Sequence, residues 1–242
     1  MSDPLQQRKL CLIFLSGAGG VGKTSVANTL QTEGEKLDLK VVCTKSTTRQ
    51  SYAKCGVSDE TACANLSAAN QTHLQDTIFY DYCANLEASI AKAIEDEQDI
   101  LVVDRSPYDH ASYMFQLIPT LELEFIEKRM KEVKVVMEAL THKHYSNRVV
   151  TAIEPQLWLF EYPTSWAKTQ ASEDGFRYAP HAKNFIWHLA LKAMLLDFRM
   201  PGEVMPVRTF RPYDLSTPLE RAHRILGCTS LTKHWHIPST KP

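Results

Sequence analysis

The sequence lacks the features of several protein classes. No apolar run approaches the ~18 residues that span a bilayer, so we expect no membrane segment. The six cysteines contain no C-x-x-C pair, which favours reduced thiols and a cytoplasmic location. A zinc site using Cys55, Cys63 and His73 is the weaker alternative, because its spacing matches no known pattern. Without repeats, low-complexity tracts or linkers, the chain is expected to form a single domain over residues 1–242.

Charge is also unevenly distributed along the chain. Residues 1–126 hold 10 Lys and Arg against 17 Asp and Glu, whereas residues 127–242 hold 17 against 11. The C-terminal half is therefore basic although the whole chain carries a net charge of −1. This split indicates an anionic partner, either nucleotide phosphates or nucleic acid.

Apolar strands alternate with helical segments from end to end. This alternation predicts an α/β fold, a doubly wound, five-stranded parallel sheet covered by helices on both faces. We expect strands at 10–15, 40–44, 99–104, 156–161 and 204–209. We expect helices near 22–33, 70–97, 107–118, 121–141, 179–197 and 216–226.

Glycine is scarce overall but concentrated at one point. Four of the nine glycines fall within residues 17–22, and the run ends at Lys23 and Thr24. The segment fits the phosphate-loop pattern G-x-x-x-x-G-K-[ST], after an apolar strand and before a helix. Its amides and the helix N-terminus would bind ATP phosphates, Lys23 would reach the β- and γ-phosphates, and the Thr24 hydroxyl would hold Mg²⁺. The predicted ATP-binding residues are Gly17, Gly19, Gly20, Val21, Gly22, Lys23, Thr24 and Ser25.

A carboxylate ends the predicted strand 99–104. Four apolar residues precede Asp104, and parallel strands deliver their last side chains to the edge of the sheet where ligands collect. Asp104 could hold Mg²⁺ through water or accept a proton from an attacking hydroxyl. A strand-ending turn residue is the alternative.

The segment after this strand carries a family resemblance. Residues 104–116 read D-R-S-P-Y-D-H-A-S-Y-M-F-Q. This resembles the D-R-x-x-x-S/D-x-x-A/S-Y-x-x-Q stretch of thymidylate kinases and the D-R-S stretch of deoxynucleoside and nicotinamide riboside kinases. The resemblance implies a P-loop kinase fold in which Arg105 contacts phosphate at the reaction centre. It also implies that Tyr113 and Gln116 face the acceptor, although Tyr113 could equally pack in the core.

The stretch Ser46-Thr47-Thr48-Arg49 follows the second strand and looks like the T-T-R triplet of guanylate kinases. By this resemblance Thr48 and Arg49 would bind the acceptor; a solvated loop arginine is the alternative. Riboside kinases often carry a carboxylate at this strand end, and this sequence does not. The role of base would then fall to Asp104, with Asp109 second.

The kinase resemblance also implies a lid that covers the phosphates at about residues 164–180. This segment includes a D-G-x-R sequence that ends at Arg177. Arg177 would bring positive charge to the transferring phosphoryl group, with Lys168 and Lys183 as lesser candidates. A polar loop with an exposed arginine is the alternative interpretation.

Together these features indicate an ATP- and Mg²⁺-dependent kinase with a nucleoside-type acceptor. Phage kinases that phosphorylate 5-hydroxymethyluracil within DNA resemble the chain in layout, so the 5-hydroxymethyl group in phage DNA is our first acceptor hypothesis; a phage enzyme would act in the host cytoplasm. A small-molecule deoxynucleoside or nucleoside monophosphate kinase is the close alternative. A regulatory ATPase without acceptor is a third. The sequence has no guanine-reading N-K-x-D motif, which favours ATP.

Overall fold

The structure of the protein is a computed structural model. The structure describes residues 6–44, 46–58, 62, 65–115, 122–140, 144–146, 149–161, 181–197, 205–210 and 217–232. Within them, no helix is long and apolar enough to cross a membrane.

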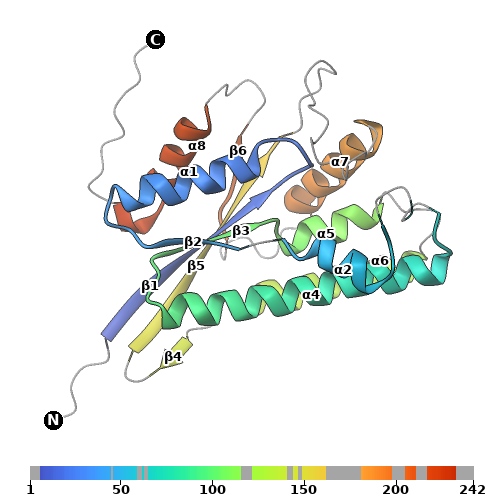
Figure 1. The fold of residues 1–242 in the computed structure, drawn as a ribbon, viewed down its shortest axis with the longest axis horizontal. Helices are drawn as coiled ribbons and strands as arrows, with labels where there is room; N and C mark the ends of the chain where they lie inside the picture. The colour runs from blue at the N-terminus through green and yellow to red at the C-terminus, as the bar shows by residue number, and fades with distance from the viewer. Residues whose placement is uncertain are drawn as a thin grey trace.

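Five parallel strands form the centre of the molecule in the order β2-β3-β1-β5-β6 (Figure 1). Their bounds are Gln6–Ser16 for β1, Val41–Cys43 for β2, Ile100–Asp104 for β3, Val149–Phe160 for β5 and Val207–Phe210 for β6. A short strand, β4 (His144–Ser146), pairs antiparallel with the start of β5. The predicted five-stranded parallel sheet is therefore confirmed, with one antiparallel strand added.

Helices cover both faces of the sheet, with α1 and α8 on one side and α4, α5 and α6 on the other (Figure 1). Helix α7 packs against α5 on that second side. The helices are α1 (Lys23–Glu35), α2 (Thr48–Lys54), α4 (Ala68–Glu95), α5 (Pro107–Met114), α6 (Leu123–Ala139), α7 (His181–Asp197) and α8 (Pro218–Gly227), followed by the 3-10 turn η2 (Ser230–Thr232).

Strand β1 divides the core in two because successive side chains point to opposite faces. Leu10, Leu12 and Phe14 join one buried cluster with α4, α5, α6 and α7. Cys11, Ile13 and Leu15 join the other with α1 and α8. Both sets are buried, as the doubly wound arrangement requires.

Some predicted boundaries were wrong. Strand β5 begins at Val149, whereas the sequence predicted its start at 156. The first half of the strand was missed because buried and half-exposed residues alternate there and because it contains Pro155, which is unfavourable within a strand. Strand β4 falls between the predicted helix 121–141 and the predicted strand at 156, where the sequence predicted no strand. Pro206 was expected within the last strand but precedes β6, where its carbonyl accepts a hydrogen bond from the Leu157 amide.

Candidate active site

Residues 17–24, the phosphate loop, turn the chain from β1 into α1 with glycines at strained positions. Gly17 has a φ of 135°, and a Cβ there would lie 2.6 Å from the Phe160 carbonyl oxygen. Gly22 has a φ of 89° and forms the N-cap of α1. Other residues adopt this left-handed region only at a cost, so the glycines of the pattern are required by the backbone.

The Lys23 side chain folds back across this loop. Its Nζ donates hydrogen bonds to the Gly17 carbonyl at 2.7 Å and to the Ala18 carbonyl at 2.8 Å, and the residue is buried. Thr24 and Ser25 follow in the first turn of α1 and are exposed. The loop thus combines a buried ammonium group, exposed hydroxyls and the N-terminus of a 13-residue helix.

Asp104 ends β3 next to the start of the loop, because it pairs in register with Leu15 of β1. Its Oδ1 is buried and has no hydrogen-bond partner. An unpartnered buried carboxylate oxygen is costly unless it has a ligand. Carboxylate and hydroxyl oxygens are donors that Mg²⁺ accepts, so Asp104 and the exposed Thr24 fit this cation.

The backbone of Arg105 is held in an unusual conformation beside Asp104. Its φ is 79°, which is rare outside glycine. The Arg105 amide donates to the Leu15 carbonyl at 2.9 Å, and the Arg105 carbonyl accepts from the Tyr82 hydroxyl at 3.1 Å. The guanidinium carbon lies 4.5 Å from the ring centroid of Trp187 in α7. Such strain at a sheet edge marks a candidate functional position.

The carboxylate of Asp109 is buried and connects α5 with the loop. Oδ1 accepts from the Gly17 amide at 3.0 Å, and Oδ2 accepts from both the amide and the hydroxyl of Ser106 at 2.8 Å. Ser106 and Asp109 form the capping box of α5. Both Asp109 oxygens are therefore used within the protein, a geometry that favours a structural role over the predicted contact with an acceptor.

Thr48 and Arg49 lie in the first turn of α2, a helix that the sequence did not predict. Asp81 of α4 fixes α2, because its carboxylate accepts from the Ser51 hydroxyl at 2.7 Å and from Lys54 Nζ at 2.6 Å. These bonds lower the pKa of Asp81, with the Lys54 bond as the largest cause. Arg49 is exposed at the helix start.

Tyr113 lies on α5, half-buried, with its ring edge-on to Trp187 at a centroid distance of 5.6 Å. Several other predicted residues fall outside the part of the chain that the structure describes. These are Gln116, Lys168, Arg177 and the expected lid at 164–180; Cys63 of the alternative zinc site is also among them. The described residues contain no cluster of three or more metal-binding side chains.

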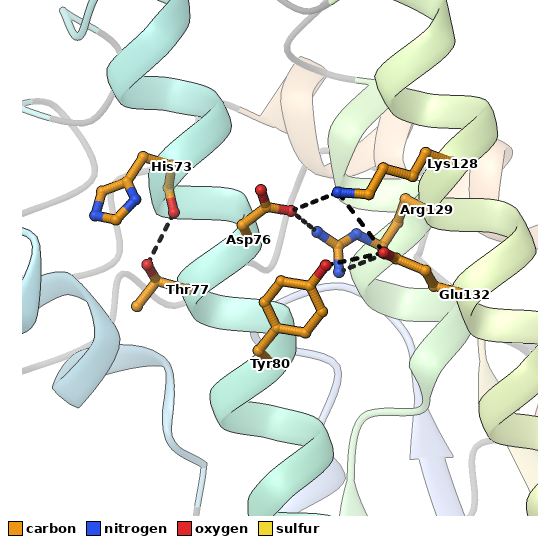
Figure 2. Close-up of polar contacts among 7 residues, drawn as sticks. All are labelled: His73, Asp76, Thr77, Tyr80, Lys128, Arg129 and Glu132. Atoms are coloured by element: carbon orange, nitrogen blue, oxygen red, sulfur yellow. Dashed lines mark hydrogen bonds and ion pairs between the residues drawn. The ribbon is translucent and has the colours of Figure 1, made fainter.

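Two buried basic residues near this region were missed by sequence reasoning. Arg129 of α6 stacks on Phe79 of α4 with its guanidinium carbon 3.9 Å from the ring centroid. Its guanidinium group also donates to Asp76 at 2.6 Å, as Figure 2 shows. His110 of α5 lies 4.3 Å, centroid to centroid, from the ring of Tyr82. Burial, and then the charges of Arg105 and Arg129, lower the pKa of His110 to about 3, so the ring is neutral at physiological pH. For Arg129 the sequence did contain a signal, because this arginine lies within the apolar stripe of the helix that became α6.

Comparison with known proteins identifies the fold. Neither a protein-family model nor a curated protein matches the sequence. A crystal structure of NadR protein in complex with NR is similar, with a TM-score of 0.54 over 92% of this chain and 12% sequence identity. The chain spans about half of that protein, since the match covers 51% of its length. The likeness shows the fold: the five parallel strands with flanking helices are those of a P-loop kinase fold.

Proposed function

We propose that this protein is an ATP- and Mg²⁺-dependent kinase that transfers the γ-phosphoryl group to a nucleoside-type acceptor. The observation that carries the proposal is the phosphate loop itself, with Lys23 folded over it and the unpartnered Oδ1 of Asp104 on the adjacent strand. The fold neighbour NadR, a nucleoside kinase, supports the same reaction class.

The residues at the ends of β1 and β3 divide the work of phosphoryl transfer. The loop amides and Lys23 would bind the β- and γ-phosphates, and Thr24 and Asp104 would hold the cation, which neutralises the charge that develops on the phosphoryl group. Arg105 would contact the transferring group, assisted by Arg177. The transition state is loose, so these groups act mainly by position and charge.

The acceptor would bind on the side formed by α2 and α5. Thr48 and Arg49 start α2, and Tyr113 lies on α5. Gln116 stays a prediction from the family resemblance. Asp104 is also the first candidate to accept the proton of the attacking hydroxyl, as the alternative to holding the cation, because one carboxylate does not serve well in both roles. The bonds of Asp109 to the loop and to Ser106 support a role in holding the loop instead.

The acceptor we propose first is the 5-hydroxymethyl group of hydroxymethyluracil in phage DNA. The basic C-terminal half of the sequence supports it, because a DNA duplex is a dense line of phosphates. A small deoxynucleoside or nucleoside monophosphate is the alternative acceptor, and it would need less positive charge.

Substitution of Lys23 tests the site. Lys23→Ala should lower the rate of ATP-dependent phosphoryl transfer by at least about 10³-fold, since the ammonium group would act on the phosphates in the transition state. Lys36→Ala is the matched control, because Lys36 lies on the surface at the end of α1 and pairs with Glu33. Full activity in Lys23→Ala, with the fold intact by circular dichroism, would refute the site.

A panel of acceptors with labelled ATP identifies the substrate. Hydroxymethylated DNA, plain DNA, free nucleosides and nucleoside monophosphates would each be tested at two salt concentrations. A DNA acceptor should bind far more weakly as salt rises, because condensed counterions are released on binding. A mononucleotide should show little salt dependence. ATP hydrolysis that no acceptor stimulates would indicate the regulatory ATPase instead.

A further inference from the structure

The indole ring of Trp187 contacts the candidate site from outside it. Trp187 is 3% exposed and lies in α7, far in sequence from Arg105, yet its ring face supports the Arg105 guanidinium at 4.5 Å. Its indole Nε1–H donates to the Ser112 hydroxyl of α5 at 2.7 Å. Tyr113 packs against its ring at nearly a right angle, 89°. Three contacts from two elements therefore fix the plane of this ring.

Hydrogen bonds continue from Trp187 to the phosphate loop. The Ser112 hydroxyl, which accepts from Trp187, donates to the Asp109 carbonyl at 2.9 Å. The Asp109 carboxylate accepts from the Gly17 amide. The Ser112 hydroxyl therefore accepts one bond and donates another. All four residues of the network, which are Trp187, Ser112, Asp109 and Gly17, are buried. Buried, fully satisfied networks hold their members rigidly.

Arg105 depends on such external support for its side chain. Its backbone is pinned at both ends, by Leu15 and Tyr82, but these bonds do not orient the guanidinium. In the described part of the chain no carboxylate pairs with Arg105; the aromatic face of Trp187 is what holds it. A cation over an indole ring keeps its N–H groups and its full charge for an anion.

We propose that Trp187 is a positioning residue that orients Arg105 for phosphoryl transfer, and that Ser112 fixes the Trp187 ring for this purpose. The inference rests on the proposed kinase function, and it adds a residue of α7 to the groups that determine the rate. Trp187 touches neither substrate in this scheme; it affects the transferring phosphoryl group through the Arg105 guanidinium that its ring supports.

The kinetic test separates the aromatic face from the rest of the side chain. Trp187→Leu removes the face and should lower kcat by about 10- to 100-fold with the KM for ATP changed little, as expected for a misplaced transition-state contact. Trp187→Phe keeps a face for Arg105 and should recover most of kcat. The double variant Trp187→Leu with Arg105→Ala should be no slower than Arg105→Ala alone, because the two residues act as one unit.

The matched control is Trp158, a second buried tryptophan, which stacks on Phe210 in the other core cluster. Trp158→Leu should lower the midpoint of thermal unfolding but leave kcat unchanged below that temperature. If Trp187→Leu behaves like Trp158→Leu, or if the losses in the double variant multiply, the positioning role is refuted.

An NMR measurement makes the test independent of catalysis. The ring current of Trp187 should shift the Arg105 Nε–H resonance, and this shift should vanish in Trp187→Leu and persist in Trp187→Phe. An unchanged resonance in Trp187→Leu would overturn the inference. A wild-type protein that shows the shift but transfers no phosphoryl group to any acceptor would instead refute the proposed function and leave the contact in place.

Discussion

The two faces of the sheet bury different kinds of residue. The core of the α1–α8 face, made by α1, α8 and the Ile13 side of β1, is filled with aliphatic and aromatic side chains. Lys23, the buried charged residue of α1, lies at the start of that helix in the phosphate loop. The α4–α7 face, made by α4 to α7 and the Leu12 side of β1, also buries Asp109, His110 and Arg129. Buried polar groups cost free energy unless they are paired, so a fold that needed only stability would not require them. On the α4–α7 face, buried polar and charged side chains thus take positions that apolar side chains could fill.

Substitution of Arg129 is expected to have the largest effect of the changes that distinguish the two faces. Its side chain is 1% exposed, yet it carries a charge that pairs with Asp76 at 2.6 Å and lies 3.2 Å from Glu132 (Figure 2). Arg129→Met should lower the free energy of unfolding by about 3 kcal/mol, because it removes the guanidinium from two partly buried carboxylates. The pKa of His110 should rise as well, since the Arg129 charge helps to lower it. Urea unfolding and NMR titration measure the two effects.

Leu30→Ala on the α1–α8 face is the control for Arg129→Met, because it should lower the free energy of unfolding by a similar amount. Leu30 is fully buried in α1, and its truncation should also cost about 3 kcal/mol, through the cavity that it leaves. It should not change the titration of His110. Equal shifts of the His110 pKa in both variants would show that general loosening, rather than the Arg129 charge, controls that residue.

His110 should give the protein an acid-sensitive stability. Its pKa is about 3 in the folded state and near 6.5 when unfolded, so only the unfolded chain binds the proton between these values. Stability from this group is complete above pH 6.5 and falls as the pH is lowered, by about 2 kcal/mol between pH 6.5 and pH 5. His110→Phe should remove this part of the pH slope.

The control for His110 is His73→Gln, since His73 is exposed and points away from the charge cluster (Figure 2). This variant should keep the full slope. Burial lowers the pKa of His188 as well, so some acid sensitivity persists in His110→Phe. If His110→Phe and the wild type lose equal stability between pH 6.5 and pH 5, the buried neutral histidine is not the cause.

The difference between the faces also explains what the sequence could predict. Apolar periodicity reports burial, so every parallel strand and long helix was found, including α8, which was expected near 216–226. The signal failed where polar residues are built into structure. Helix α2 has no long apolar stripe and is held by the polar bonds of Asp81, which no local pattern predicts.

The candidate site also has a part that the sequence could predict and a part that it could not. The phosphate loop is a local motif, so its backbone shape followed from the positions of Gly17 and Gly22 in the sequence. The roles assigned to its residues stay predictions. The link from Trp187 to Arg105 joins residues 82 positions apart, and the Asp109 contact with Gly17 joins residues 92 apart. Such contacts come from topology, which a single sequence does not display.

The smallest expected effect concerns a charged cluster on the α1–α8 face. Glu33 of α1 accepts from Lys36 at 2.6 Å and lies 2.8 Å from His223 Nε2 of α8; these hydrogen bonds, the one from Lys36 first, lower the pKa of Glu33. The benefit is present above the unfolded pKa of about 4.5 and is lost as the pH falls through the lower folded value. Because exposed pairs contribute little, Glu33→Gln should lower the unfolding midpoint at pH 7 by less than about 2 °C.

The difference between Glu33→Gln and the wild type should shrink as the pH is lowered from 7 toward 3, because the benefit is lost as the pH falls through the folded pKa of Glu33. Differential scanning calorimetry at the two pH values, with Lys134→Gln as a control for the loss of one surface charge pair, measures this. A drop of more than about 5 °C at pH 7 would mean that α8 is held to α1 by charge as much as by its buried Ile225 and Leu226. The contrast between an apolar face and a face with placed charges would then be wrong.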